Sequence, residues 1–205
     1  YRVDMRLRPF GDSGALALSF SAIEYYYQAH GREWERYALI KARPVAGDIE
    51  QGEALLQELR PFIYRRYLDY GAIEQLRDMK AMIDAEARRK HSLGDVKLGP
   101  GGIREIEFCA QVFQLMRGGH IPALRQRSLQ TTLDKLSGLE LLSATDTQKL
   151  QAAYAFLRRT ENRIQMWRDQ QTHTLPQDSE QQLQLAKSMQ FESWPDFLTE
   201  LNHHQ

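Results

Sequence analysis

Apolar and charged side chains alternate strictly over the first eight residues. Apolar residues stand at positions 3, 5 and 7, and charged residues stand at positions 2, 4, 6 and 8. Successive side chains on a strand point to opposite faces, so this alternation predicts a β-strand that ends at Pro9. A turn with two glycines over residues 10–14 and a short returning strand over residues 15–19 are predicted to follow.

Helical signals appear next, interrupted by one extended segment. Ser21–Glu24 is typical of a capping box, and Gly31 is typical of a helix end, so a helix is predicted between them. A second helix is predicted over residues 32–40. Residues 41–48 are expected to be extended and to form at most an edge strand, because the residue before a proline is pushed out of the helical region.

Beyond about Asp48, β-type alternation disappears and helical spacing continues to the last residues. Apolar stripes with caps or breakers predict helices over about residues 50–69 (broken by Pro61), 76–90, 103–117, 128–136, 143–168 and 179–189, and from residue 193 onward. The apolar stripe of the second of these helices consists of Leu76, Met79, Ile83 and Ala87. The chain is therefore predicted to be mainly α, with a small β-containing part up to Asp48 and a helical bundle after it.

Composition narrows the classes of protein. Lys plus Arg and Asp plus Glu both number 27 among 205 residues, so the formal net charge is zero and bulk electrostatic binding to nucleic acid or membrane is not expected. Transmembrane and signal-peptide patterns are absent. The single Cys109 excludes an intrachain disulfide and favours a cytoplasmic location. Because the chain opens inside a strand pattern, we expect it to be a piece of a longer protein.

The first candidate for chemistry is the predicted N-terminal strand. Asp4 shares its charged face with Arg6 and Arg8, which together could hold a hard cation such as Mg²⁺ and phosphate oxygens. The alternative is a half-exposed strand whose charges pair in solvent. Lys41 and Arg43 alternate in the same way and form a second candidate phosphate-binding face, for which the alternative is an exposed edge strand.

A glycine-rich segment over residues 97–102 that runs into an apolar helix is the second candidate. Such a junction can offer free N–H groups and a helix dipole to an anion, with Lys97 and Arg104 beside it, although it matches neither a Walker A loop nor a dinucleotide fingerprint. Helical spacing places Glu107 on a polar stripe that can face a cleft. Glu105 falls among apolar residues, where it needs a charged partner. A structural ion pair is the alternative for both acids.

Glu161 is the remaining acid with an unusual position, because it falls on the buried side of the predicted 143–168 helix. Arg158 and Arg159 are interpreted as flanking cations rather than as its partners. Glu161 is therefore predicted to belong to a core ion pair rather than to act as a catalytic base. The six histidines show no metal-ligand spacing.

Three separated motifs resemble one family. The segments VDMRLRPFGDSG, GREWERYALIKARPVAGD and KLGPGGIREIEF, the last followed by QVFQLMRGG, are similar to the bacterial glutamine-synthetase adenylyltransferases, also called glutamate-ammonia-ligase adenylyltransferases. This resemblance implies a bifunctional enzyme with two polymerase-β-like nucleotidyltransferase domains, one adding AMP to glutamine synthetase and one removing it by phosphorolysis to give ADP. GIREIEF, with Arg104 and Glu105, resembles the N-terminal, adenylyl-removing half.

By the same resemblance, residues 1–48 are the distal part of a nucleotidyltransferase domain, and residues 49–205 are a helical bundle. Asp4 matches the third metal-binding carboxylate, whereas the upstream Gly-Ser and two aspartates of the family do not occur in this sequence. The implied cofactor is Mg²⁺, with Arg6 or Arg8 holding phosphate. Implied partners are adenylylated glutamine synthetase, the PII signal protein, nucleotide and phosphate, with neither nucleic acid nor membrane among them.

Two alternatives stay open from the sequence. The chain could be a helical docking module that binds glutamine synthetase or PII without chemistry of its own. It could also belong to another nucleotidyltransferase of the superfamily, such as the PII uridylyltransferase, although GIREIEF matches that enzyme less well. A Gly-Ser and two aspartates shortly upstream of Tyr1 in the parent reading frame would decide for an enzyme, and their absence would favour the docking module.

Overall fold

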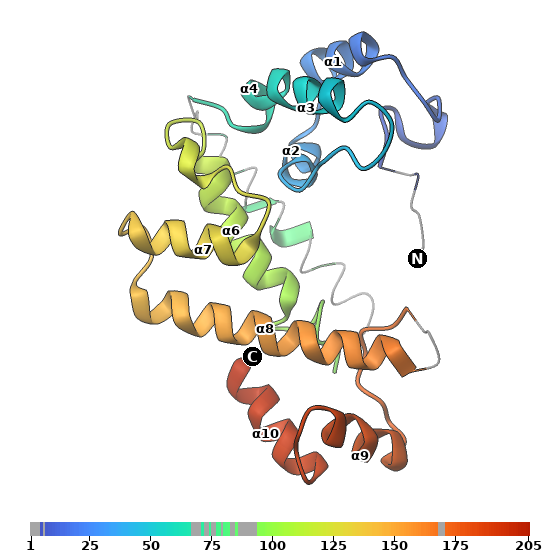
Figure 1. Ribbon diagram of the computed structural model, residues 1–205, viewed down its shortest axis with the longest axis vertical. Coiled ribbons are helices and arrows are strands. Elements are labelled where there is room, and N and C mark those ends of the chain that lie inside the picture. The colour runs from blue at the N-terminus through green and yellow to red at the C-terminus, as the bar shows by residue number, and fades with distance from the viewer. Residues whose placement is uncertain are drawn as a thin grey trace. The chain divides into compact units, whose positions relative to one another are not determined.

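The architecture of the chain is helical (Figure 1). The computed structural model describes residues 5, 7–66, 71, 74, 77–78, 80–82, 85, 94–167 and 171–205. Across these residues there is no β-strand, and the β-type contact found in them is an isolated antiparallel bridge between Asp95 and Thr174. The prediction of a mainly α chain is therefore confirmed.

The helices described in the first part of the chain are η1 (Gly11–Ser13), α1 (Phe20–Ala29), α2 (Glu33–Leu39), α3 (Ile49–Glu58) and α4 (Arg60–Ile63). Those of the second part are α6 (Ile103–Arg117), η2 (Pro122–Leu124), α7 (Leu129–Gly138), α8 (Ala144–Met166), α9 (Ser179–Ser188) and α10 (Trp194–His204). The predicted stripe of Leu76, Met79, Ile83 and Ala87 lies outside the described residues.

Short polar side chains set most helix starts. Ser143 Oγ accepts a hydrogen bond from the Asp146 N–H at 3.0 Å, and Ser193 and Ser128 cap α10 and α7 in the same way. The start of α1 differs from the prediction. Its cap is Ser19, whose Oγ accepts from the Ala22 N–H at 3.2 Å, and the proposed cap Ser21 lies within the first helical turn. These caps confirm the predicted helices and move one boundary by two residues.

The strands predicted before residue 48 are not found among the described residues. Met5 and Leu7 are 48% and 68% exposed, and residues 15–19 and 42–48 have no ladder partner there. The backbone bonds near η1 are local instead, since the Gly11 N–H donates to the Arg8 carbonyl at 2.9 Å. Residues 5, 7 and 8 of the first predicted strand are not in a strand, and its other residues lie outside the described part of the chain. A strand also needs a neighbour to accept its N–H groups, which alternation does not guarantee. Asp4 and Arg6 lie outside the described residues.

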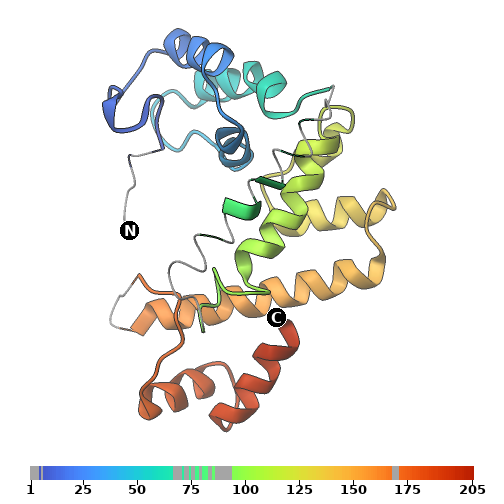
Figure 2. The same ribbon diagram turned by 180° about the vertical axis from the view of Figure 1, so that it is seen from behind.

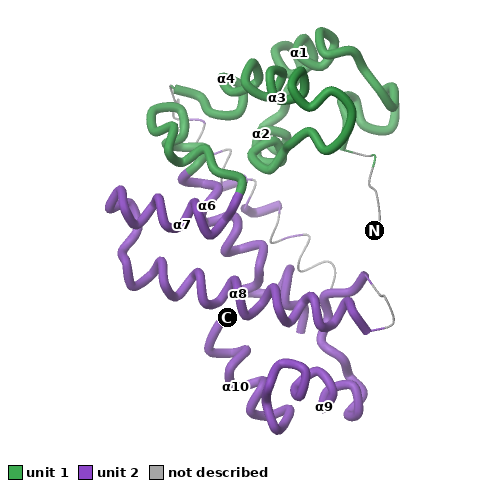
Figure 3. The backbone as a smooth tube through the Cα atoms, viewed as in Figure 1, with its two compact units in different colours: residues 1–69, 114–127 green, residues 70–113, 128–205 purple. Residues whose placement is uncertain are grey.

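The chain divides into two compact units, shown in Figure 3. Unit 1 comprises residues 1–69 and 114–127, and unit 2 comprises residues 70–113 and 128–205, in each case as far as they are described. By compactness, therefore, α3 and α4 belong with α1 and α2. The boundary predicted near Asp48 separates a catalytic domain from a helical bundle. The division into compact units does not test that boundary, so it stays a prediction.

Unit 1 is held together by apolar contacts around two buried charged residues of α2. Glu35 is 4% exposed and accepts hydrogen bonds from the Tyr26 hydroxyl at 2.9 Å and the Arg32 N–H at 2.7 Å. Arg36 is 3% exposed and donates from Nε and Nη2 to the Ile63 carbonyl, at 3.2 Å each. Since every buried charge needs such partners, these bonds fix α2 against α1 and the end of α4.

Unit 2 is built around α8, which α7 and α10 contact, with α9 packed on both α8 and α10. Figure 1 and Figure 2 show α7 and α8 running side by side from both directions. An aromatic cluster joins α8 to α10, where the rings of Phe156 and Phe197 stack at 6.0 Å. Phe197 and Leu157 are 0% exposed. Burial of such side chains contributes about 1.5–3 kcal/mol each, so this core holds α8 in a fixed place.

Candidate functional site

A network of charged side chains in unit 2 is centred on Glu161 of α8. Glu161 is 3% exposed, and three groups surround its carboxylate. Arg158 Nη1 lies 2.7 Å from Oε2, while Lys97 Nζ and His173 Nδ1 lie 3.2 and 3.1 Å from Oε1. The predicted core ion pair is therefore present. Arg158, interpreted from sequence as a flanking cation, is in fact a direct partner of Glu161.

These partners outweigh the cost of burying the carboxylate. Burial by itself would raise the pKa of Glu161, but the hydrogen bond from Arg158 and the positive charge of Lys97 hold that pKa below its usual value. Glu161 is therefore ionised near neutral pH. An acid held in that form is a poor proton carrier at pH 7, which favours a structural role over general-base catalysis.

Arg158 extends the network to α6. Its Nη2 lies 2.8 Å from Glu107 Oε1, and its Nε donates to the Tyr154 hydroxyl at 3.1 Å. All three guanidinium nitrogens thus have partners, and despite burial the pKa of Arg158 is raised by its bonds to Tyr154 and Glu161. Glu107 was predicted to face a cleft or to form a structural ion pair, and the structure shows an ion pair.

His173 is the third partner of the Glu161 carboxylate. Burial, together with the neighbouring charge of Lys97, lowers the pKa of His173 and outweighs the opposite effects of Glu161 and Asp95. His173 Nδ1 lies 3.1 Å from Glu161 Oε1 and 3.3 Å from the amide nitrogen of Gln165. Asp95 accepts hydrogen bonds from the N–H groups of Lys97 and Leu98, both at 2.8 Å, and so fixes the turn that carries Lys97.

The depressed pKa of His173 gives a pH dependence with a defined sign. The unfolded chain binds a proton near pH 6.5, before the folded chain does, so stability is lost as the pH falls below about 6.5. We expect His173→Asn, whose amide nitrogen can replace Nδ1, to reduce this loss between pH 7 and 5. Thermal melts at several pH values measure it. His203→Asn, at an exposed position of α10, is the matched control and should keep the wild-type slope.

The glycine-rich segment before α6 differs from the predicted anion site. The N–H groups of Gly102, Ile103 and Arg104 donate to carbonyl oxygens of residues 99, 96 and 97 at 3.0–3.1 Å. The Gly101 N–H donates to Glu105 Oε2 at 2.9 Å. The segment therefore uses these N–H groups itself and does not leave them free for a phosphate. Gly101 has φ +66, and a Cβ there would lie 2.2 Å from the Gln205 carbonyl oxygen, so glycine is required at that position.

The prediction that Glu105 lies buried among apolar residues is wrong, and the alternative of an ion pair is found instead. The side chain of Glu105 is 39% exposed and forms an ion pair with Lys80. We expect Glu105→Gln to cost less than about 1 kcal/mol, because exposed ion pairs contribute little and glutamine can still accept from the Gly101 N–H. Urea unfolding measures this cost. A loss comparable to that of Glu161→Gln would contradict this assignment.

Two of the candidate residues of unit 1, Arg8 and Lys41, donate hydrogen bonds to backbone carbonyl groups of the same unit. Arg8 donates from Nε to the Gly14 carbonyl at 3.2 Å, and a second guanidinium nitrogen donates to the Met5 carbonyl. Lys41 donates from Nζ to the Arg127 carbonyl at 3.0 Å, and Arg43 is exposed. No described contact joins Arg8 to Lys41 or Arg43. Their roles in phosphate binding, like those of Lys97, Arg104 and Glu107, stay predictions.

The predicted metal ligand is Asp4, which lies outside the described residues. Within the described part of the chain, no group of three or more His, Cys, Asp and Glu side chains could hold a metal ion. These residues alone therefore do not form the Mg²⁺ site that the resemblance implies. No helix in that part is long and apolar enough to cross a membrane.

Comparison with known families matches both parts of the chain. Residues 77–205 match the family model described as GlnD PII-uridylyltransferase, and residues 1–58 match the one described as Glutamate-ammonia ligase adenylyltransferase. Because the first match covers more than half of the chain, the chain belongs to that nucleotidyltransferase-related family.

Similarity to individual proteins defines the family more narrowly, because these relatives carry the same name. The chain is 57% identical over 205 residues to the bifunctional glutamine synthetase adenylyltransferase/adenylyl-removing enzyme of Thioalkalivibrio sulfidiphilus, and 54% identical over 205 residues to that of Nitrosococcus oceani. Each match covers 100% of this chain and 21% of the relative. The resemblance predicted from the three motifs is confirmed, and the chain spans about a fifth of the length of these relatives.

Sequence reasoning identified none of the three partners of Glu161. Arg158 stands three residues before Glu161, a spacing that places side chains on one helix face, so the pair could have been predicted. His173 lies beyond the end of α8, and its contact with Glu161 depends on how the chain returns toward residues 95–97. No local pattern reveals that return.

Proposed function

We propose that the intact protein containing this chain removes AMP from adenylylated glutamine synthetase by phosphorolysis and releases ADP. The observation that carries the proposal is the 57% identity over the whole chain to a bifunctional adenylyltransferase/adenylyl-removing enzyme. Arg104 and Glu105 in the motif GIREIEF support the assignment to the adenylyl-removing half, since the other half resembles GGIVDIEF there. Phosphate is the proposed nucleophile, so no side-chain nucleophile is required.

In this proposal the described residues have a positioning role. The Mg²⁺ ions, when bound, would neutralise charge that develops on the transferring phosphorus. Asp4, Arg6 and Arg8 are the residues of this chain proposed to lie near that centre. The Glu161 network fixes α6, α8 and the glycine-rich segment relative to one another within unit 2. ATP binding, PII binding and a cytoplasmic location belong to the same proposal.

A second candidate function is a docking module for glutamine synthetase. One observation favours it for unit 2, because Lys97 and Glu107, two of the proposed nucleotide-binding residues, are held in ion pairs within the unit. Under this alternative, unit 2 would bind the partner protein while chemistry occurs elsewhere in the parent.

These two functions are distinguished by comparing ADP release by residues 1–205 with ADP release by the intact parent protein. We expect residues 1–205 alone, incubated with adenylylated glutamine synthetase, Mg²⁺ and phosphate, to release ADP at least about 10²-fold more slowly than the intact parent, because misplaced reacting groups lose that much rate. The assay is quantification of ADP by chromatography. Comparable rates would show that the active centre is complete in this chain. An intact parent that releases no ADP would contradict the proposed function, and retained binding to glutamine synthetase would then favour docking.

A further inference from the structure

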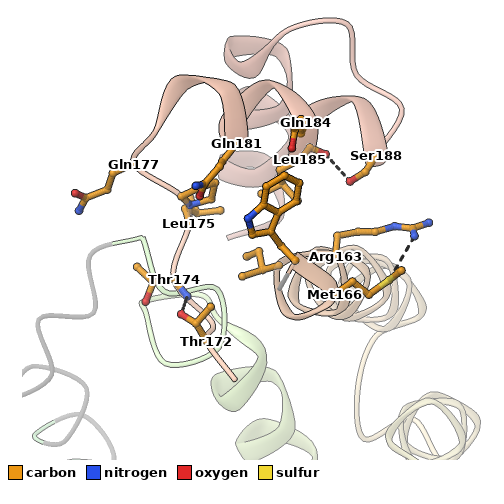
Figure 4. A pocket seen from close by; sticks show the side chains of 13 residues that line it. Arg163, Met166, Thr172, Thr174, Leu175, Gln177, Gln181, Gln184, Leu185 and Ser188 are labelled. Carbon is orange, nitrogen blue, oxygen red and sulfur yellow. Dashed lines mark hydrogen bonds between the residues drawn. The ribbon is translucent and has the colours of Figure 1, made fainter. Parts of the chain in front are cut away.

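A pocket of about 570 Å³ lies between the end of α8, helix α9 and residues 172–177, all within unit 2. Its size falls in the roughly 300–1,000 Å³ range of small-molecule sites. Figure 4 shows Gln181 and Gln184 of α9 on one side, Thr172 and Thr174 on the opposite side, and Arg163 with Met166 at one end. None of these residues belongs to the Glu161 network.

The described lining favours a ligand with a flat apolar part and an anionic group. Apolar side chains, among them Ile164, Leu175 and Leu185, supply most of the wall, together with the indole of Trp167. Arg163 is the charged residue among the described lining residues, and no carboxylate is among them. An anionic group of a ligand can pair with Arg163.

One acceptor in the wall lacks a hydrogen bond. Gln184 Nε2 donates to Glu180 Oε1 at 3.2 Å, and because a carboxylate only accepts, this bond fixes the orientation of the amide. The other amide atom, Gln184 Oε1, is buried and has no hydrogen-bond partner among the described residues. A buried carbonyl oxygen without a partner is costly, so a ligand whose N–H group displaces the side chains that cover this oxygen would gain a favourable hydrogen bond.

We propose that this pocket binds an aminopurine nucleoside monophosphate. The flat ring would lie against Trp167 and the apolar wall, the exocyclic amino group would donate to Gln184 Oε1, and the phosphate would pair with Arg163. The hydroxyls of Thr172 and Thr174 and the amide of Gln181 are available for ring nitrogens or ribose. This site lies beyond the proposed reaction and does not depend on it, because binding is measured without turnover.

Equilibrium binding to residues 1–205 tests the proposal with three probes. AMP carries the amino group, inosine monophosphate carries a carbonyl in its place, and inorganic phosphate carries the charge alone. We expect AMP to bind with a Kd between about 1 µM and 1 mM by calorimetry. Inosine monophosphate should bind at least about tenfold more weakly, because its carbonyl would face the Gln184 carbonyl. Phosphate alone should not bind measurably at the same concentrations.

Substitutions in the lining test whether AMP binds in this pocket. Gln184→Leu replaces the amide with an apolar group and so removes the acceptor, and it should weaken AMP binding by about tenfold. Gln181→Trp fills the pocket and should abolish AMP binding. Gln148→Leu changes an exposed glutamine of α8 outside the lining and is the matched control, expected to bind AMP as the wild type does. Thermal melts of each variant establish that it is folded.

Three results would overturn the proposal. Equal affinity for AMP and inosine monophosphate would show that Gln184 Oε1 receives no donor. Undiminished AMP binding by folded Gln181→Trp would place the nucleotide elsewhere. Absence of AMP binding at millimolar concentration would show that the pocket does not take this class of ligand.

Discussion

Glu161→Gln is expected to lower the free energy of unfolding of unit 2 by about 3 kcal/mol, because removing one partner of a buried ion pair leaves the others uncompensated. We place the value at the low end of the range for such pairs, since the side chains of Arg158 and Lys97 are 33% and 32% exposed and water can screen them. For a chain of this size, the melting temperature should fall by about 6–12 °C.

The matched control is Glu192→Gln, which changes an exposed glutamate in unit 2 and should alter stability by less than about 0.5 kcal/mol. Thermal and urea unfolding followed by circular dichroism measure both variants. Equal melting temperatures for wild type and Glu161→Gln would contradict the central position of Glu161 in the network.

The second large effect is expected at Asp4 in the intact protein. If Asp4 is the third metal-binding carboxylate, Asp4→Asn should reduce ADP release from adenylylated glutamine synthetase by at least about 10²-fold, because loss of a ligand displaces the reacting groups. Folding should be nearly unchanged, because the substitution preserves size and removes one charge. The measurement is the rate of ADP release at saturating phosphate and Mg²⁺.

Asp12→Asn is the control for this prediction. Asp12 lies in η1 and its side chain is 85% exposed, with Arg8 4.0 Å away. We expect this variant to retain the wild-type rate of ADP release. Similar rates for Asp4→Asn and wild type would remove Asp4 from the proposed metal site and with it the assignment of residues 1–48 to the catalytic domain.

Helices were the part of this fold that could be predicted, because their causes are local. The α8 helix is an example, since Ser143 caps it and its apolar stripe repeats at helical spacing as far as Ile164. The strands predicted before residue 48 could not be predicted reliably from local sequence. Residues 41–48 look extended in sequence and are extended in part, but a strand requires a partner that no local pattern guarantees.

In the candidate site, too, features with a local cause could be predicted, and contacts between residues far apart in the sequence could not. Glu161 was recognised as a buried acid from its position on a helix face, whereas its contact with Lys97 joins residues far apart in the sequence. The prediction of free N–H groups before α6 was wrong for a related reason. The turn at residues 96–99 folds back and supplies carbonyl acceptors to the N–H groups of residues 102–104.

The division of unit 1 between two separate stretches affects the order in which the protein can fold during synthesis. His120 contacts the Arg66 carbonyl, and Arg125 lies over the ring of Tyr64 at 5.5 Å. Arg127 pairs with Glu53 at 2.8 Å. Folding on the ribosome proceeds from the N-terminus, yet α3 and the residues that follow α4 cannot make all of these contacts until Arg127 has left the exit tunnel. Nascent chains arrested before residue 114 would therefore expose Tyr64 and be open to chaperones and proteases.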